Sequence, residues 1–282
     1  MHEILVIGHV CIDENRMEHD SYRGPGGPAM FMAKIFRQIP DCHLTIIAPY
    51  GADFIPYTRE ISFYPPKPNV SNTMRYTNTI VEGKRTQTCA NWEDAKPIPM
   101  DKTFIQSIKA ADTICFAPLA PTIEQDYVRE ILTFRKSDST TVLLPQGYFR
   151  AFSSDGTVRV GEFTEASGVL PLIDIVIVSD EDHPDMLNLG QVWSIRYKNN
   201  VVVTQSERGA ADILNGIIKE VPTTPVPSNQ IISSVGAGDA FAAGFIYQFH
   251  LSHDIEKSVI EGNVIARQCL LRRPDDIRVD VY

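Results

Sequence analysis

Residues 233–245 read SSVGAGDAFAAGF, the most informative stretch of the sequence. Two glycines, Gly236 and Gly238, bracket Ala237 immediately before Asp239, and a helix rich in small residues is expected to begin there. Backbone N–H groups at such a helix N-terminus converge where an anion can sit. A carboxylate within a phosphate cradle does not help simple binding, but phosphoryl transfer needs one to accept the proton of the attacking hydroxyl. The same string is also compatible with a tight turn in which Asp239 is only a helix N-cap.

On both sides of this stretch, short apolar runs alternate with longer helical patterns. Apolar runs rich in β-branched residues are typical of buried parallel strands joined by crossover helices. The runs are 4–7, 44–48, 113–116, 141–144, 173–178 and 201–204, and the helical patterns include 29–38, 122–135, 238–251 and 254–270. The alternation predicts an α/β sandwich of the doubly wound type.

Residues 72–91 interrupt the alternation. Segments 73–81 and 85–90 are rich in Thr, Tyr and Val and flank a turn at 82–84, which predicts a β-hairpin. The polar segment 13–23 is expected to pair with it. An extra hairpin in an α/β core often forms a lid over a site, although an edge hairpin without such a role is nearly as common.

Composition excludes several classes of function. The 282 residues have a net charge of -9, from 26 basic and 35 acidic residues, which argues against a nucleic-acid-binding role. Five cysteines without CxxC spacing and seven histidines without HxxxH or HExxH spacing predict neither disulfides nor a zinc site. No run reaches the ~18 apolar residues of a spanning helix, so a soluble, cytoplasmic protein without membrane contact is expected.

The 233–245 string resembles the C-terminal signature of the PfkB carbohydrate kinases, which are ribokinase-like. In that family a GAGD element supplies an anion hole and its Asp is the general base. The resemblance implies that Asp239 is catalytic, with Gly236, Ala237 and Gly238 forming the anion hole. It also implies a three-layer α/β/α sandwich with a mostly parallel central sheet, a small β lid, and ATP with Mg²⁺ as cofactors.

Other positions match the family in order and spacing. Gly8 with Asp13, the pair Gly26-Gly27, the GxD-like segment 48–54, the segment 204–209 and Asn263 each resemble a family element. The resemblance implies substrate binding by Asp13, Gly26 and Gly27, and nucleotide contacts at Thr204, Ser206, Gly209 and Asn263. Alternatives remain open: Asp13 could be an ordinary turn residue, the two glycines could serve positive φ before a helix, and Thr204 could be a plain strand residue.

Four positions, Phe31, Leu144, Ser179 and Ser233, depart from the family pattern. Phe31 stands where a polar substrate-binding Asn is common, which predicts an aromatic face toward the substrate, and Ser233 replaces an acid near the loop implicated in monovalent-cation binding. Potassium activation is therefore not expected.

The family's N-x-x-E element organises magnesium through water. Ser179 and Asp182 stand in its first and last places, so Asp182 is a candidate magnesium residue. Alternatively, Asp182 is part of a solvated acidic loop. Residues 144–150 resemble a D-x-Q-G-x-x-R variant with Leu144 in place of Asp. Gln146 and Arg150 become candidate substrate or phosphate contacts, although both could be surface residues.

The sequence thus predicts one ribokinase-like domain, residues 1–282, with a lid formed by about 13–24 and 72–91. The expected reaction moves the γ-phosphate of ATP to a hydroxyl of a small polyol: a sugar, a cyclitol or a nucleoside. Pairing of the lids could form a homodimer. The rival is a non-catalytic ligand sensor, favoured by the four departures. An NAD-binding Rossmann enzyme is excluded because no G-x-G-x-x-G follows the first strand.

Overall fold

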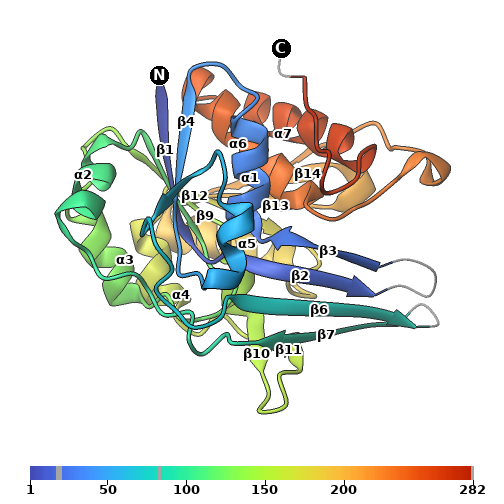
Figure 1. The fold of residues 1–282 in the computed structure, drawn as a ribbon. Coiled ribbons are helices and arrows are strands. Elements are labelled where there is room, and N and C mark those ends of the chain that lie inside the picture. Colours follow the sequence, from blue (N-terminus) through green and yellow to red (C-terminus); the bar gives the residue numbers. More distant parts are fainter. Residues whose placement is uncertain (17–20, 82–83, 281–282) are drawn as a thin grey trace.

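The computed structural model describes residues 1–16, 21–81 and 84–280. Within these residues, nine strands form one central sheet (Figure 1). From one edge to the other its strands are β15 (Ile217–Val221), β14 (Ala210–Leu214), β13 (Asn200–Thr204), β12 (Ile175–Ser179), β9 (Thr140–Leu143), β8 (Thr113–Ala117), β1 (His2–Gly8), β4 (Cys42–Ile47) and β5 (Ser62–Tyr64). Neighbours from β13 to β5 pair in parallel, whereas β14 and β15 add an antiparallel edge.

Helices cover both faces of this sheet. One layer contains α1 (Pro28–Phe36), α6 (Ala237–Ser252) and α7 (Ile255–Leu270); the other contains α2 (Lys102–Ala110), α3 (Gln125–Leu132), α4 (Ala166–Val169) and α5 (Met186–Tyr197). Side chains alternate along strand β1, so Ile4 and Val6 pack with the first layer while Leu5 and Ile7 pack with the second. The three-layer α/β/α architecture is confirmed. No helix in the described part of the chain is long and apolar enough to cross a membrane.

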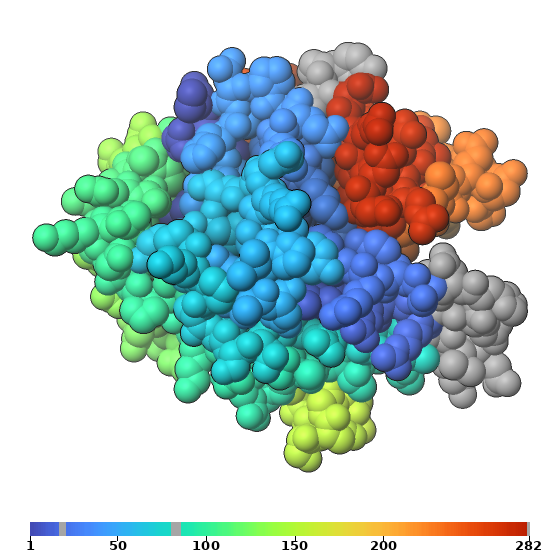
Figure 2. All heavy atoms as spheres, in the orientation of Figure 1, coloured from blue at the N-terminus to red at the C-terminus, as the bar shows by residue number. Residues whose placement is uncertain are grey.

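A second sheet lies at one end of the central sheet, and we call it the side sheet. Its order is β3 (Ser21–Gly26), β2 (Cys11–Arg16), β6 (Met74–Val81) and β7 (Lys84–Ala90). The expected hairpin is present as β6 and β7, and segment 13–23 contributes strands beside it; the tip of the hairpin, 82–83, lies outside the described residues. In Figure 2 the blue surface of the first strands adjoins the red surface of the C-terminal segment.

Thr73, which is fully buried, joins the side sheet to the central sheet. Its hydroxyl donates to Asp53 Oδ1 at 2.7 Å and accepts from the Gly51 N–H at 2.9 Å. Its carbonyl accepts from Asn91 Nδ2 at 3.0 Å, so both ends of the β6–β7 hairpin meet at this residue. Asp53 belongs to the GxD-like segment, and its role in the structure is to hold the base of the hairpin. The two-stranded sheet of β10 (Arg150–Phe152) and β11 (Val158–Val160) lies beside β7.

Candidate functional site

Residues 236–238 at the start of α6, which we call the glycine loop, are open toward solvent on one side and packed against the protein on the other. Gly236, the N-cap of α6, has φ 82°, and a Cβ there would lie 2.4 Å from Cδ1 of Phe31, so both conformation and space require glycine. A Cβ on Gly238 would meet nothing within 4 Å. The backbone of Gly238 is therefore approachable, and Asp239 follows it in the first turn of the helix.

Phe31 on α1 lies beneath this loop. Its ring is 2% exposed and fills the space against Gly236. The expectation that Phe31 presents an aromatic face to a substrate is wrong, because the ring is part of the core. On the other side of the loop, the Ser233 hydroxyl accepts a hydrogen bond from the Val235 N–H at 3.2 Å.

Asp239 has the electrostatic character of a base that works near neutral pH. Burial is the main cause that raises its pKa to about 7, and the negative charges of Asp13 and Asp182 add to the effect, whereas Arg150 opposes it. These three charged side chains, which come from distant parts of the sequence, therefore surround one carboxyl group. A general base is most effective when its pKa lies near the working pH.

Asp182 is a second carboxyl group in the same cluster, and it is half-buried. Burial raises its pKa, while the Ser179 N–H, the Arg150 charge and a hydrogen bond with the Gln146 side chain oppose the rise. The structure thus brings Gln146, Arg150 and Asp182 together, as their candidate roles require. Leu144, in contrast, is 6% exposed and packs in the hydrophobic core.

The carboxylate of Asp13 occupies space that Gly26 leaves free. A Cβ on Gly26 would lie 2.0 Å from Asp13 Oδ2, and the Cys11 thiol donates to Oδ1 at 3.3 Å. Gly27 serves a different purpose, since it begins α1 with φ 90° and a Cβ there would lie 2.9 Å from a methyl group of Leu119. Gly26 is therefore required by the space that the Asp13 carboxylate occupies, and Gly27 by the positive φ at the start of α1.

His9 is a site residue that the sequence did not reveal. It is 1% exposed; its Nδ1 accepts from the Leu119 N–H at 2.9 Å and its Nε2 donates to the Ala95 carbonyl at 3.0 Å. Burial lowers its pKa to about 4, so the ring is neutral at pH 7. The Leu119 carbonyl in turn accepts from Arg150 at 3.3 Å and from the Tyr76 hydroxyl at 2.6 Å.

Tyr76 supports Arg150 directly as well, because the guanidinium carbon lies 4.6 Å from the centre of its ring. His9 and Tyr76 thus fix Arg150 beside Asp239. Their partners lie tens of residues away in sequence, and no local motif could have identified them.

Some of the residues predicted to bind the nucleotide lie close together in the structure. Gly209 has φ 99°, and a Cβ there would lie 2.3 Å from the Val221 carbonyl oxygen, which also accepts from Asn263 Nδ2 at 3.4 Å. Ser206 adopts a left-handed conformation in the same turn, and the Thr204 hydroxyl donates to the Val178 carbonyl at 3.4 Å. Asn263 is only 7% exposed, so its amide holds the edge of the sheet.

An ion pair links this turn to the strand end that carries Asp182. Arg208 Nη2 donates to Asp180 Oδ2 at 2.7 Å. This bond joins the turn at 204–209 to the acidic segment 179–182, whose Asp182 acts on Asp239.

No cluster of three or more His, Cys, Asp or Glu side chains in the described ranges could hold a metal ion by itself. Mg²⁺, however, usually keeps several waters and binds one or two carboxylates together with substrate phosphates. The carboxylate of Asp182, beside Asp239, fits this limited role through water. The residues present are thus compatible with Mg²⁺ that arrives with a nucleotide.

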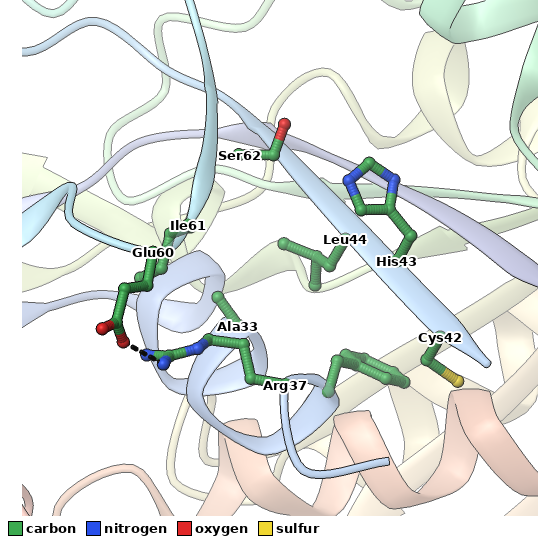
Figure 3. Close-up of a pocket in the computed structure, with 9 residues that line it drawn as sticks. Ala33, Arg37, Cys42, His43, Leu44, Glu60, Ile61 and Ser62 are labelled. Carbon is green, nitrogen blue, oxygen red and sulfur yellow. Dashed lines mark hydrogen bonds and ion pairs between the residues drawn. The ribbon is translucent and has the colours of Figure 1, made fainter. Parts of the chain in front are cut away.

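The small cavity in Figure 3 lies apart from these residues. It measures about 140 Å³ and is lined by α1, β4 and the segment before β5, with an ion pair between Arg37 and Glu60 at its rim. None of the candidate site residues contributes to it. A cavity of this size is also below the range typical of small-molecule sites.

Solved structures share this architecture over nearly the whole chain. A pyrophosphate-dependent kinase of the ribokinase family, complexed with a pyrophosphate analogue and myo-inositol, matches with a TM-score of 0.74 at 15% identity, over 98% of this chain and 97% of that chain. The ribokinase of Arabidopsis thaliana, complexed with ribose and ATP, matches with a TM-score of 0.70 at 14% identity, over 97% and 94%. The chain therefore has a ribokinase-like fold.

The family follows from the sequence comparison. The model for the pfkB family carbohydrate kinases matches residues 60–276, so the chain belongs to the PfkB family. It is 30% identical over 101 residues to the cytidine kinase of Thermococcus kodakarensis, which is 36% of this chain and 35% of that protein. It is 35% identical over 66 residues to adenosine kinase 2 of Arabidopsis thaliana, covering 23% and 19%. These matches span about a third or less of the curated relatives' length.

The cluster around Asp239 makes a direct electrostatic prediction. Asp13→Asn removes a negative charge and should lower the pKa of Asp239 from about 7, whereas Arg150→Met removes a positive charge and should raise it. The pKa can be followed by NMR titration of ¹³C-labelled aspartate carboxyls, with the resonance assigned through Asp239→Asn. As a control, Asp155→Asn changes an exposed aspartate and should leave the titration unaltered. A carboxyl that titrates near 4 in all variants would refute the cluster.

Proposed function

We propose that the protein transfers the γ-phosphoryl group of ATP to a hydroxyl of a small polyol, with Asp239 as general base. The observation that supports this proposal most directly is the combination of a carboxyl with a pKa of about 7 and an open glycine backbone immediately before it. A plain N-cap would need neither feature.

In the proposed reaction, the Asp13 carboxylate, which fills the space that Gly26 leaves free, accepts hydrogen bonds from hydroxyl groups of the acceptor. The reacting hydroxyl gives its proton to the Asp239 carboxylate as its oxygen forms a bond to the γ-phosphorus. The bond from that phosphorus to the bridging oxygen breaks, and ADP leaves with the electron pair. N–H groups of Gly236 and Gly238 stabilise the charge that develops on the phosphoryl oxygens, and the Ala237 N–H, which donates to the Ser234 carbonyl at 3.2 Å, would turn from that bond to join them.

Arg150 supplies a guanidinium beside this position, and its planar donors suit a phosphoryl group. The base is active when ionised, and Arg150 favours that form of Asp239. Mg²⁺ would contribute by neutralising phosphate charge, with Asp182 holding it through water and Gln146 orienting the Asp182 carboxylate.

The nucleotide would lie along the surface formed by Thr204, Ser206, Gly209 and Asn263, next to the glycine loop. Segments 13–24 and 72–91, which contribute to the side sheet, would close over the acceptor as a lid and exclude water that otherwise hydrolyses ATP. Its edge strands offer a surface through which two copies could pair. Ser233 provides no carboxylate for a monovalent cation, so the reaction should not require potassium.

The candidate acceptors are a nucleoside, a sugar or a cyclitol. Support for nucleosides comes from the cytidine and adenosine kinases among the relatives, and support for a sugar or a cyclitol from the structures bound to ribose and myo-inositol. The structure gives less support to a sensor without catalytic activity, because such a protein would not need a carboxyl group whose pKa is raised to about 7, as that of Asp239 is.

The decisive experiment measures ATP consumption and phosphomonoester formation with Mg²⁺ across a panel of nucleosides, sugars and cyclitols. We expect turnover with at least one acceptor, and Asp239→Asn should lower kcat about 10²- to 10⁴-fold, the usual contribution of a general base. Nucleotide binding, measured by calorimetry, should be retained in this variant. Full activity of Asp239→Asn would refute its assignment as the base, and ligand-dependent thermal stabilisation without any turnover would favour the sensor.

Gly238→Ala separates stability from activity. The new Cβ meets no protein atom within 4 Å, and alanine in a helix is favoured over glycine by roughly 0.5–1 kcal/mol, so the free energy of unfolding should stay equal or rise. The same methyl group enters the space where phosphoryl oxygens would approach the backbone. We expect kcat/KM to fall about 10-fold or more, measured beside a urea denaturation curve. Unchanged kcat/KM would show that phosphate does not approach Gly238.

A further inference from the structure

Arg150 lies at the point where the chain passes from the core of the central sheet to the side sheet. The residue before it, Phe149, is 3% exposed and packs in the core on the side of the central sheet that α5 covers. Phe152, two residues after Arg150, packs instead against a hydrophobic cluster that contains Tyr76 and Cys89 of the side sheet. The position of Arg150 therefore depends on two separate groups of packed side chains.

Strands β10 and β11 form a hairpin that begins at Arg150 and lies beside β7 (Figure 1). At the base of this hairpin, the Gly161 N–H donates to the Phe149 carbonyl at 2.7 Å. Near its tip, the Ser153 N–H donates to the Thr157 carbonyl at 2.9 Å. Because hydrogen bonds join its two strands from the base to the tip, a displacement of the tip is transmitted to Arg150.

The tip of the hairpin is bonded to β7, the edge strand of the side sheet. The Cys89 N–H in β7 donates to the Gly156 carbonyl at 2.8 Å, and Thr88 and Thr157 form an antiparallel bridge. Gly156 has φ 83°, and a Cβ there would lie 2.9 Å from the Cys89 carbonyl oxygen, so the contact requires glycine. The hairpin and the side sheet thus share one network of backbone hydrogen bonds.

An aromatic contact makes a second connection. The ring of Phe152 in β10 stacks on the ring of Trp92, which lies two residues after the end of β7. The ring centres are 4.5 Å apart and the ring planes differ by 17°. Both side chains are half-buried. Stacked aromatic pairs have a preferred geometry, so this contact favours one position of β10 relative to the side sheet.

The side chain of Arg150 extends from the side sheet to the proposed base. Its guanidinium carbon lies 4.6 Å from the centre of the Tyr76 ring in β6. Its positive charge acts on Cys89 in β7 and also on Asp182 and Asp239. A shift of the side sheet relative to the central sheet would therefore change the place of this charge beside Asp239.

We propose that the β10–β11 hairpin links the side sheet to Arg150, so that the contacts of Phe152 with Trp92 and of Gly156 with Cys89 place the guanidinium beside Asp239. This inference rests on the proposed function, in which the side sheet closes over the acceptor. Closure then carries Arg150 to the phosphoryl group in the same movement that excludes water. Phe152 and Trp92 are positioning residues, since they act only through Arg150.

Phe152→Ala removes the ring that stacks on Trp92. We expect kcat to fall about 10- to 10²-fold, the cost of misplacing a catalytic group by about 1 Å, while KM for ATP changes little. In protein that already carries Arg150→Met, the same substitution should lower kcat no further, because the group that it positions is absent. Phe152→Tyr keeps the ring and should keep kcat. Losses that multiply in the double variant would contradict the link.

Val160→Ala is the matched control. It removes an apolar side chain from the same hairpin, but this side chain is 62% exposed and lies on β11. We expect kcat to stay unchanged, with or without Arg150→Met. Thermal unfolding of each variant is measured in parallel. An equal loss of kcat in Phe152→Ala and Val160→Ala would show a general effect of the hairpin and would overturn the positioning role.

If no acceptor is phosphorylated, the proposed function fails, but the link can still be tested by NMR. In protein labelled with ¹⁵N-arginine, the Nε resonance of Arg150 is assigned through Arg150→Met and is sensitive to the nearby Tyr76 ring. Phe152→Ala should shift this resonance, whereas Phe152→Tyr and Val160→Ala should leave it in place. A resonance that Phe152→Ala does not move would overturn the link, whatever reaction the protein catalyses.

Discussion

The burial of the Asp239 carboxyl group beside Asp13 is the constraint on which the rest of the site depends. Two carboxylates share one partly buried region, and desolvation, to which repulsion from Asp13 adds, raises the pKa of Asp239 to about 7. The structure maintains this unfavourable arrangement through neighbouring contacts. Gly26 leaves room for one carboxylate, Gly236 begins the helix that carries the other, and Arg150 limits the repulsion. His9 and Tyr76 are important because they hold Arg150 in position.

The parallel sheet explains how residues from distant parts of the chain meet at this cluster. Ligand sites in open α/β sheets lie beyond the carboxyl ends of the strands. Asp13 follows β1, Arg150 follows β9, Asp182 follows β12, and the turn at 204–209 follows β13. Helix α6 brings the glycine loop to the same edge, and Thr73 ties the side sheet beside it. One edge of the sheet therefore collects Asp239, which is the proposed base, its charged neighbours and the hairpin that is proposed to cover them.

Local patterns in the sequence were sufficient for the glycine loop and for strands β1, β4, β8, β9, β12 and β13, whereas the edge strands β5, β14 and β15 were not predicted. The buried strands appear as apolar runs because both of their faces are covered, and the loop at 236–239 carries its chemistry in four consecutive residues. Contacts across long sequence distances were not accessible. The position of Phe31 beneath Gly236 and the bonds of His9 depend on packing between separate elements. Helix α5 was not named because Gly190 and its weak amphipathic pattern conceal it, although Gly190 packs closely against Ile213.

The dependence of kcat/KM on pH tests the central claim most directly, since it reports the pKa of the base in the free enzyme. Burial and Asp13 raise the pKa of Asp239 above its usual value, so the protonated, inactive form persists to higher pH. The account predicts that kcat/KM rises about tenfold per pH unit below pH 7 and levels off above it. A profile that is flat between pH 5 and 8 would contradict the assignment of Asp239 as the base.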